Sequence, residues 1–310
     1  MKNFLPVEYK KNNTLKLNHS YLVEQFSDYS KIFKEIEKVV KKGDYTLGQK
    51  VDECEKNFAR RTGAKFAISV GNGTDALFLS LKALNIGNGD EVITTPYTFI
   101  ATIGSITTSG AKPVFVDCDE RMQINPDLIE QAITPKTKGI VPVHWMGCLA
   151  DMDRIMEIAN QHNLVVVEDA CPALGAEIDG KRCGSFGKAS GFSFHPLKPL
   201  NVWGDGGSIT TDDDDVAEFL TRYRNHGMID RDHIEMWGIN SRIQPIQAVV
   251  AIRVLDTVDH SNDIRIRNAQ LLDEGLRGLE EFINIPERSS KYKDVYQLYV
   301  IQAKKRDQLV

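Results

Sequence analysis

The chain has 310 residues and a mass of 34.8 kDa, with 42% hydrophobic and 26% charged residues. Its formal net charge is −5, because 38 Lys and Arg face 43 Asp and Glu, and this argues against nucleic acid as the main partner. The composition is ordinary for a soluble globular protein with one large and one smaller domain, and the absence of a signal peptide or an apolar run of ~18 residues predicts a cytoplasmic protein without a membrane segment.

Two helices are expected before residue 65, over Ser30–Lys42 and Gln49–Arg61. From residue 65 to 170, short apolar runs alternate with helical patterns. The expected strands are Phe66–Val70, Glu91–Thr94, Pro113–Asp117, Gly139–Val143 and Leu164–Asp169, and the expected helices are Thr74–Leu84, Ala101–Thr108, Pro126–Ile133 and Asp151–Gln161. Strands separated by such helices predict βαβ units and a mostly parallel, buried sheet, whose ligands gather at the C-terminal ends of the strands.

The region after residue 170 continues the pattern with shorter elements. We expect a hairpin over Ala176–Cys183, strands over Ala189–Phe194, Gly207–Thr210 and Val295–Ala303, and helices over Asp213–Arg224, from about Pro245, and from Arg306 to Val310. The last helix stops without a cap, which suggests a small α+β domain that is incomplete.

No metal site is expected. The five cysteines (Cys54, Cys118, Cys148, Cys171 and Cys183) show neither a CxxC pair nor zinc spacing, so free thiols in a reducing compartment are predicted. The acidic run Asp212–Asp215 is interpreted as the start of a helix, where carboxylates complement the N-terminal partial charge.

The segment Gly71–Ala76 (GNGTDA) follows a predicted strand and opens a predicted helix. Free N–H groups at a helix N-terminus bind phosphate, and glycines let the phosphate approach. The GxGxxA spacing also matches a dinucleotide fingerprint, but that fingerprint needs an acid at the end of the next strand, whereas Asp90 and Glu91 stand at its beginning. The motif therefore favours a phosphate-binding turn; a purely structural turn is the other alternative.

Two later strands end in residues suited to catalysis. The apolar run ending at Asp169 brings a carboxylate to the ligand-bearing edge, where it would hold a cationic ring nitrogen or else cap a helix. The strand ending at Phe194 leads into a loop that presents Lys198 among apolar residues, where desolvation would leave a nucleophilic amine; a solvated surface charge is the alternative. A lysine for a Schiff base, an acid for the ring nitrogen and a phosphate cup are together what pyridoxal phosphate requires.

These residues resemble the DegT/StrS-type sugar aminotransferases, which belong to the fold type I class of pyridoxal-phosphate enzymes. The resemblance runs from about Gly43 to the end of the chain. Its anchors are Gly43–Gly48, Asn72–Leu77, Thr95–Thr102, Glu168–Ala170, Phe192–Phe194 with Lys198, Gly204–Gly207, Arg224–Gly227, Gly238–Arg242, and Gln247-Ala248.

The resemblance implies that Lys198 forms the Schiff base and moves a proton during transamination, while Asp169 pairs with the pyridinium. Further cofactor contacts would come from Gly73, Thr74, Asp75, Phe99, Ser193 and Asn225. Of these, Thr74 and Asp75 would offer backbone amides to the phosphate, Ser193 its hydroxyl, and Phe99 its ring to the cofactor or simply to the core.

The resemblance also implies a homodimer with shared active sites. Asn225 would reach the phosphate in the neighbouring subunit, with Asn240 and Arg242 near the same interface. Arg242 would bind a carboxylate or sugar phosphate, or form an interface salt bridge. His195 would face the sugar or brace its own loop.

Three features depart from the family pattern. Pro172 stands where a glutamine near the ring hydroxyl is common, Leu174 stands where histidine is common, and the chain ends earlier than family members do. The contact to the ring hydroxyl is therefore in question.

We expect a fold type I α/β protein, with a mostly parallel sheet between two layers of helices and a smaller C-terminal domain. Residues 1–42 would form an N-terminal extension and helix, 43–243 a large α/β domain that binds pyridoxal phosphate, and 244–310 the incomplete small α+β domain.

The expected activity is transamination of a keto-sugar, a nucleotide- or phosphate-linked hexose, with glutamate as the amino donor. One branch of the family replaces the lysine with histidine and dehydrates sugars, so Lys198 favours amination. A catalytically impaired sensor or regulator and a dinucleotide-binding oxidoreductase are the alternatives.

Overall fold

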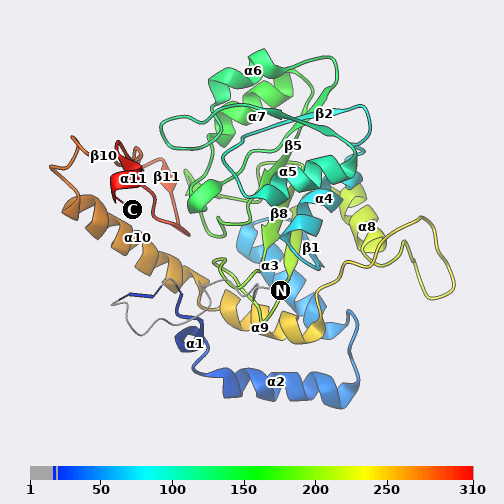
Figure 1. Ribbon diagram of the computed structural model, residues 1–310. Coiled ribbons are helices and arrows are strands. Elements are labelled where there is room, and N and C mark those ends of the chain that lie inside the picture. Colours follow the sequence, from blue (N-terminus) through cyan, green and yellow to red (C-terminus); the bar gives the residue numbers. More distant parts are fainter. Residues whose placement is uncertain (1–16, 19, 310) are drawn as a thin grey trace, which may run out of the picture.

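A seven-stranded sheet forms the middle of the molecule in the computed structural model, which describes residues 17, 18 and 20–309 (Figure 1). The strand order is β1-β9-β8-β5-β4-β2-β3, and β9 runs antiparallel to both of its neighbours while the remaining pairs are parallel. The bounds are β1 Phe66–Val70, β2 Glu91–Thr94, β3 Lys112–Phe115, β4 Thr137–Ile140, β5 Val165–Asp169, β8 Ala189–Ser193 and β9 Gly207–Thr211. The predicted mostly parallel α/β sheet is confirmed.

Helices cover both faces of this sheet. One face packs against α2 (Tyr29–Lys42), α3 (Gln49–Thr62), α7 (Met152–Gln161) and α9 (Pro245–Leu255), and the other against α4 (Gly73–Ala83), α5 (Ile100–Ser109) and α8 (Asp214–Tyr223). The remaining helical segments are α1 (Leu22–Gln25), the 3₁₀ turns Pro126–Leu128 and Trp145–Gly147, α6 (Ile129–Ala132), α10 (Val258–Gly275) and α11 (Arg306–Leu309). In the described part of the chain, no helix is long and apolar enough to cross a bilayer.

Consecutive residues of the central strands feed two different cores. Ile93 and Val166 belong to the larger core with α2, α3 and α9, whereas Val92 and Val167 belong to the core beneath α4 and α5. Successive side chains of a strand point to opposite faces, so a strand covered on both sides must be apolar throughout. This explains why these strands read as continuous apolar runs in the sequence.

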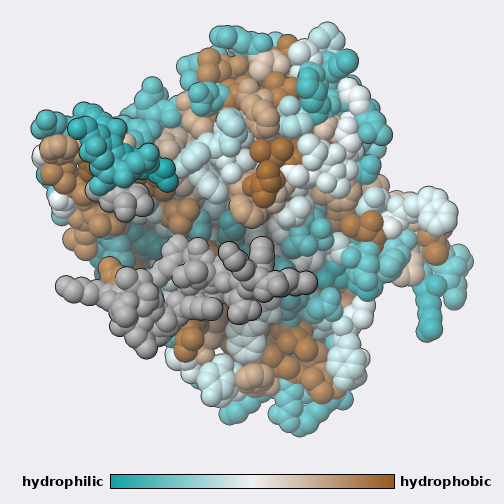
Figure 2. Space-filling view, in the orientation of Figure 1, coloured by the Kyte–Doolittle hydropathy of each residue, from teal (hydrophilic) through white to brown (hydrophobic). Residues whose placement is uncertain are grey.

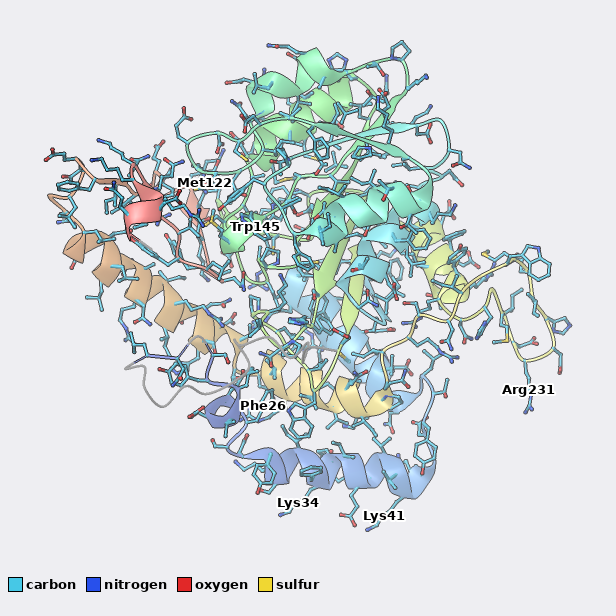
Figure 3. All side chains as sticks on the ribbon, viewed as in Figure 1. Phe26, Lys34, Lys41, Met122, Trp145 and Arg231 are labelled. Atoms are coloured by element: carbon cyan, nitrogen blue, oxygen red, sulfur yellow. The ribbon has the colours of Figure 1, made fainter. Side chains whose placement is uncertain are left out.

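The connection between α8 and α9 projects from the body of the molecule, with Arg231 at its far end (Figures 1 and 3). Figure 2 shows hydrophobic as well as hydrophilic side chains on this projection. Three large apolar side chains on it are exposed: Ile229 at 57%, Ile234 at 63% and Trp237 at 94%. An apolar cluster left in solvent on a projecting segment is typical of an interface.

The C-terminal segment differs from the prediction. The hairpin expected over Ala176–Cys183 is present as β6 (Glu177–Ile178) and β7 (Lys181–Arg182), and β11 (Tyr292–Lys293) pairs with β6. The strand predicted over Val295–Ala303 is wrong for most of its length, since only β12 (Gln302–Ala303) forms and pairs with β10 (Ile283–Asn284).

The physical reason lies in the backbone around residue 296. Tyr296 adopts a left-handed conformation (φ 48°), which interrupts an extended strand. The neighbouring amides of Val295 and Leu298 instead donate to the carbonyls of Gly147 (2.8 Å) and Met146 (3.2 Å). The alternating apolar pattern therefore covers the 3₁₀ turn Trp145–Gly147 rather than forming a strand.

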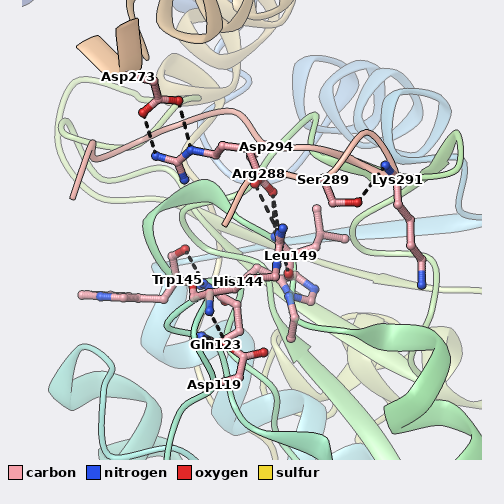
Figure 4. Close-up of polar contacts among 12 residues, drawn as sticks. Asp119, Gln123, His144, Trp145, Leu149, Asp273, Arg288, Ser289, Lys291 and Asp294 are labelled. Atoms are coloured by element: carbon pink, nitrogen blue, oxygen red, sulfur yellow. Dashed lines mark hydrogen bonds and ion pairs between the residues drawn. The ribbon is translucent and has the colours of Figure 1, made fainter. Parts of the chain in front are cut away.

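Buried polar contacts hold this segment in place (Figure 4). The Asp294 carboxylate accepts from the Leu149 amide (3.3 Å) and from the Arg121 guanidinium (3.3 Å). Gln123 Oε1 accepts from the Trp145 amide (3.1 Å), and Arg288 pairs with Asp273 (3.2 Å). Residues 294–298 are thus fixed against the loop that follows β4. The proposed division of the chain at residues 43–243 and 244–310 stays a prediction, and residues 1–16, 19 and 310 lie outside the described residues.

Glu168 of β5 accepts hydrogen bonds that hold the loop before β8 against the sheet. Its fully buried carboxylate accepts from His144 Nε2 (2.9 Å), from Ser190 Oγ (2.8 Å) and from the amides of Gly184, Phe186 and Gly187 (2.9, 2.8 and 2.8 Å). The Ala150 amide donates to His144 Nδ1 (3.4 Å), so the ring proton is on Nε2. Burial alone would raise the pKa of Glu168, but the bonds from His144 and the backbone amides lower it below its ordinary value.

We predict that Glu168→Gln lowers the free energy of unfolding by about 1–3 kcal/mol, because its NH₂ group would face buried donors that would lose their acceptor. Since the folded-state pKa is depressed, the stabilisation is fully present above about pH 4.3 and is lost as the pH falls through the folded value. Urea unfolding at several pH values measures this, with the exposed Glu281→Gln as a matched control. Equal effects of the two substitutions at pH 7 would contradict the role of Glu168.

Candidate active site

A cavity of about 1090 Å³ lies where β5 and β8 end and α4 begins. Most of the predicted site residues line it, and these are Gly73, Thr74, Asp75, Phe99, Asp169, Ser193, His195 and Lys198. They lie at the ends of β1, β2, β5 and β8 or in the loops that follow, and strands running in the same direction bring these ends together at one edge of the sheet. Asn225, Asn240 and Arg242 are absent from the lining.

Asp169 is the last residue of β5 and is 5% exposed. Its Oδ2 accepts from the Thr102 hydroxyl (2.6 Å) and its Oδ1 from the Cys171 amide (3.2 Å). In turn, Thr102 Oγ1 lies 2.7 Å from Thr98 Oγ1. Among the described residues, no lysine or arginine pairs with this carboxylate. A buried anion held only by neutral donors is suited to a cationic ligand.

Lys198 lies on the turn that follows β8. Its backbone amide donates to the His195 carbonyl (2.9 Å), and its carbonyl accepts from Asn201 Nδ2 (3.3 Å). The side chain is half-buried in the cavity wall, and within residues 17, 18 and 20–309 its Nζ has no hydrogen-bond or ion-pair partner. The amine is therefore uncommitted and directed at the same cavity as Asp169.

The segment around α1 packs over the Lys198 turn. Gln25 and Asn201 exchange two side-chain hydrogen bonds of 3.2 Å each. Phe26, labelled in Figure 3, packs edge-on against Trp203 with ring centroids 5.6 Å apart. Residues of the α1 segment thus line one side of the cavity, a contribution that the sequence pattern did not predict.

The N-terminus of α4 forms the expected cup with one change. Asn72 caps the helix, and its Oδ1 accepts from the Asp75 amide (2.8 Å), so this amide is already engaged. The first amides of a helix lack partners within it, which leaves those of Gly73 and Thr74 for an anion. The Asp75 carboxylate accepts from the Ser241 hydroxyl (2.6 Å), which itself accepts from the Gly71 amide (3.0 Å).

Gly73 and Ser193 face each other across this cup. A Cβ at Gly73 would come within 2.6 Å of the Ser193 Cβ and 3.1 Å of its Oγ. Only glycine allows the helix terminus and the end of β8 to approach this closely. A hydroxyl and two amides therefore converge on one small volume. Cys171 lines the same place, and burial, followed by the nearby Asp169, raises the pKa of its thiol, which stays protonated.

His195 and Phe99 complete the predicted set within the cavity. The Leu197 amide donates to His195 Nδ1 (3.3 Å), which puts the ring proton on Nε2, and burial lowers the pKa of this imidazole. Phe99 precedes α5 and is 62% exposed, so it is not a core residue. Its ring borders the cavity, which leaves the stacking role a prediction.

Asn225, Asn240 and Arg242 form a separate cluster at the base of the projecting connection. Asn225 and Asn240 pair as an antiparallel bridge, and Arg242 Nη1 donates to Asn225 Oδ1 (2.7 Å). The Ser241 amide donates to the Arg224 carbonyl (2.9 Å). The Ser241 hydroxyl also donates to the Asp75 carboxylate at the cup. The cluster is therefore next to the cup, although Asn225, Asn240 and Arg242 do not line the cavity.

Sequence reasoning gave no role to several residues that line the cavity, namely Thr102, Trp145, Ser261, Arg265, Gln297 and Leu298. Thr102 belongs to the family motif Thr95–Thr102, but only the fold brings its hydroxyl to Asp169. Of the two residues that depart from the family pattern, Pro172 lines the cavity, whereas Leu174 is buried in the core.

A family model described as the DegT/DnrJ/EryC1/StrS aminotransferase family matches residues 27–310. The chain belongs to this family. It is 40% identical to a "Pleiotropic regulatory protein" of Geobacillus stearothermophilus (93% of this chain, 78% of that protein). It is 37% identical to a dTDP-3-amino-3,4,6-trideoxy-alpha-D-glucose transaminase of Micromonospora megalomicea (94% and 79%). The structure of S. venezuelae DesV in complex with a ketimine intermediate superimposes with a TM-score of 0.90 at 37% identity (93% and 78%).

The chain is thus a pyridoxal-phosphate-dependent aminotransferase, as the resemblance implied, and a dinucleotide-binding oxidoreductase has no support from these matches. The cavity fits this cofactor on its own geometry. The uncommitted Lys198 amine suits the aldehyde, the Asp169 carboxylate without a cation suits the protonated ring nitrogen, and the glycine-lined cup suits the phosphate.

We predict that Thr102→Val slows the reaction with the amino donor by about 10- to 100-fold, because a hydrogen bond to a charged group contributes about 1.5–3 kcal/mol. Thr102→Ser keeps the hydroxyl and should stay near wild type. Thr108→Val, on an exposed position of the same helix, is the matched control. Stopped-flow spectroscopy of the bound cofactor after mixing with glutamate measures the rate, and an unchanged rate in Thr102→Val would count against this contact.

Proposed function

We propose that this chain transfers the amino group of glutamate to the carbonyl of a nucleotide-linked keto-sugar. The observation that carries the proposal is the shared cavity of Lys198 and Asp169, set beside a cup for the cofactor phosphate. The similarity to a dTDP-amino-sugar transaminase supports the substrate class. The cavity volume of about 1090 Å³ is at the upper end of ligand pockets, which span roughly 300–1000 Å³. It therefore leaves room for a substrate beside the cofactor.

Pyridoxal phosphate, when bound, supplies an electron sink for the carbon that loses its proton. The protein's contribution is to place the amine of Lys198 at that carbon. Lys198 Nζ would take the proton from the donor's α-carbon and return it at the cofactor's C4′. The turn that carries it is fixed by the amide-to-His195 bond and by Asn201, so the amine moves on a rigid base.

Asp169 would keep the ring nitrogen protonated. Its carboxylate is oriented by Thr102 and by the Cys171 amide, neither of which carries a charge that would compete with a cation. The buried Glu168 on the same strand fixes the loops beneath it. The electrostatic partner of the cofactor is therefore set before any ligand arrives.

His195 would bind the sugar through its protonated Nε2. Burial lowers the pKa of its imidazole, so the ring stays neutral at pH 7. The Leu197 amide donates to Nδ1, and the single ring proton is therefore on Nε2. A neutral ring also avoids placing a second cation beside Lys198. A neutral N–H donor is suited to a hydroxyl of the sugar.

We infer that the working unit is a homodimer with shared sites. The apolar residues Ile229, Ile234 and Trp237 are exposed on the projecting connection, and the cluster of Asn225, Arg242 and Asn240 lies at its base. Such a projection could place the cluster at the cofactor phosphate of a second copy. Arg242 would then orient Asn225 toward that phosphate.

Two other functions remain as alternatives. The relative named a pleiotropic regulatory protein favours a regulator, and a sugar dehydratase is the second. A regulator without catalysis would bind pyridoxal phosphate but would not convert it with glutamate. A dehydratase would remove water from the sugar instead of transferring an amino group to it. The presence of Lys198 argues against this reaction.

We predict that wild-type protein converts its bound cofactor with glutamate and then aminates at least one member of a panel of dTDP- and UDP-linked keto-sugars. Lys198→Ala should abolish both half-reactions, whereas Lys34→Ala, at an exposed position, should leave them unchanged. Absorbance follows the first half-reaction and mass spectrometry the second. Undiminished turnover in Lys198→Ala would refute the lysine assignment, and an inert wild type would favour the regulator.

Shared sites can be tested with hybrid dimers. Lys198→Ala and Asn225→Ala dimers are each expected to be impaired, but a mixed dimer of the two contains one site with both residues intact. We predict that co-expressed mixed dimers recover up to about half of the wild-type activity per dimer, since one of two sites is complete. No recovery in purified mixed dimers would contradict a phosphate contact across the interface.

A further inference from the structure

We propose that Arg265, with Ser261, forms a second anion subsite of the cavity, which holds the diphosphate of the nucleotide-linked substrate. This inference rests on the proposed function. Both residues lie on α10 one helical turn apart, so their side chains face the same side of the helix. Both line the cavity that Lys198 and Asp169 share.

The guanidinium of Arg265 has no counter-charge in the protein. Its Nη1 donates to Asn262 Oδ1 (3.3 Å), a neutral amide whose Nδ2 donates to the Leu174 carbonyl (2.9 Å). Within the described residues, no carboxylate lies within ion-pair distance of Arg265. Two other half-buried arginines do have such partners, since Arg121 pairs with Asp294 and Arg288 pairs with Asp273.

This unpaired cation is also partly removed from water. Arg265 is half-buried, and burial lowers the pKa of its guanidinium. A charge withdrawn from solvent without a partner costs free energy that a bound anion restores. The planar fork of arginine binds phosphate oxygens through two N–H groups, and a serine hydroxyl beside it adds a further donor.

The position of Arg265 favours a diphosphate over the other anions of the reaction. The cofactor phosphate has its own cup at the start of α4, a helix that lies apart from α10 in Figure 1, although residues of both line the cavity. Gln297 and Leu298 of the C-terminal segment line the same cavity as Arg265, and Gln297 Nε2 donates to the Leu197 carbonyl on the Lys198 turn (3.0 Å). A keto-sugar at Lys198 would thus extend its nucleotide toward α10.

The test measures binding of dTDP and UDP to the holoenzyme by calorimetry. Arg265→Gln should weaken both by about 10- to 100-fold, and Ser261→Ala by a few-fold, as expected for loss of hydrogen bonds to a charged group. Arg265→Lys should lie between Arg265→Gln and wild type, because the charge remains without the fork. Arg267→Gln, exposed on the same helix, is the matched control and should bind both like wild type.

The glutamate half-reaction separates the possible outcomes. It should proceed at the wild-type rate in Arg265→Gln, which also shows that the variant is folded and loaded. If nucleotide binding is unchanged in Arg265→Gln, or if the loss appears in the glutamate arm alone, the subsite is refuted while the proposed function stands. If wild type fails to aminate any nucleotide-linked sugar, the proposed function fails instead.

Discussion

The carboxylate of Asp169 is the constraint around which the site is built. It is buried at the end of β5, held by the Thr102 hydroxyl and the Cys171 amide, and lacks a cationic partner among the described residues. An arrangement of this kind is unfavourable unless a cation binds. In the proposed function the protonated ring of pyridoxal phosphate would supply that cation, so cofactor binding and chemistry would both depend on this one side chain.

The rest of the architecture serves to bring other groups to this carboxylate. Parallel strands place Ser193 and Lys198 on the same edge of the sheet, and the close approach of Gly73 to Ser193 shapes the cup. The neighbouring residue on β5, the fully buried Glu168, accepts hydrogen bonds from three loop amides and from His144. Neighbouring positions on β5 thus carry one carboxylate that is buried in the interior and one that lines the cavity.

The sequence was informative where local pattern and site coincide. Apolar runs ending in Asp169 and near Lys198, and glycines around Asn72, predicted the strands and the candidate residues that line one cavity, because these signals are local. The contacts of Thr102 and Arg265 could not be predicted, since each arises from elements that only the fold brings together. The strand predicted after Val295 was wrong because its apolar residues cover a turn instead of joining a sheet.

The central claim is that Lys198 carries the cofactor. Borohydride reduction of the holoenzyme fixes pyridoxal phosphate to the amine that holds it, and peptide mass spectrometry then locates the modified lysine. The account predicts a stoichiometric label on the peptide containing Lys198, and loss of this label after glutamate is added before reduction. A label on any other lysine, or no label on protein saturated with pyridoxal phosphate, would contradict it.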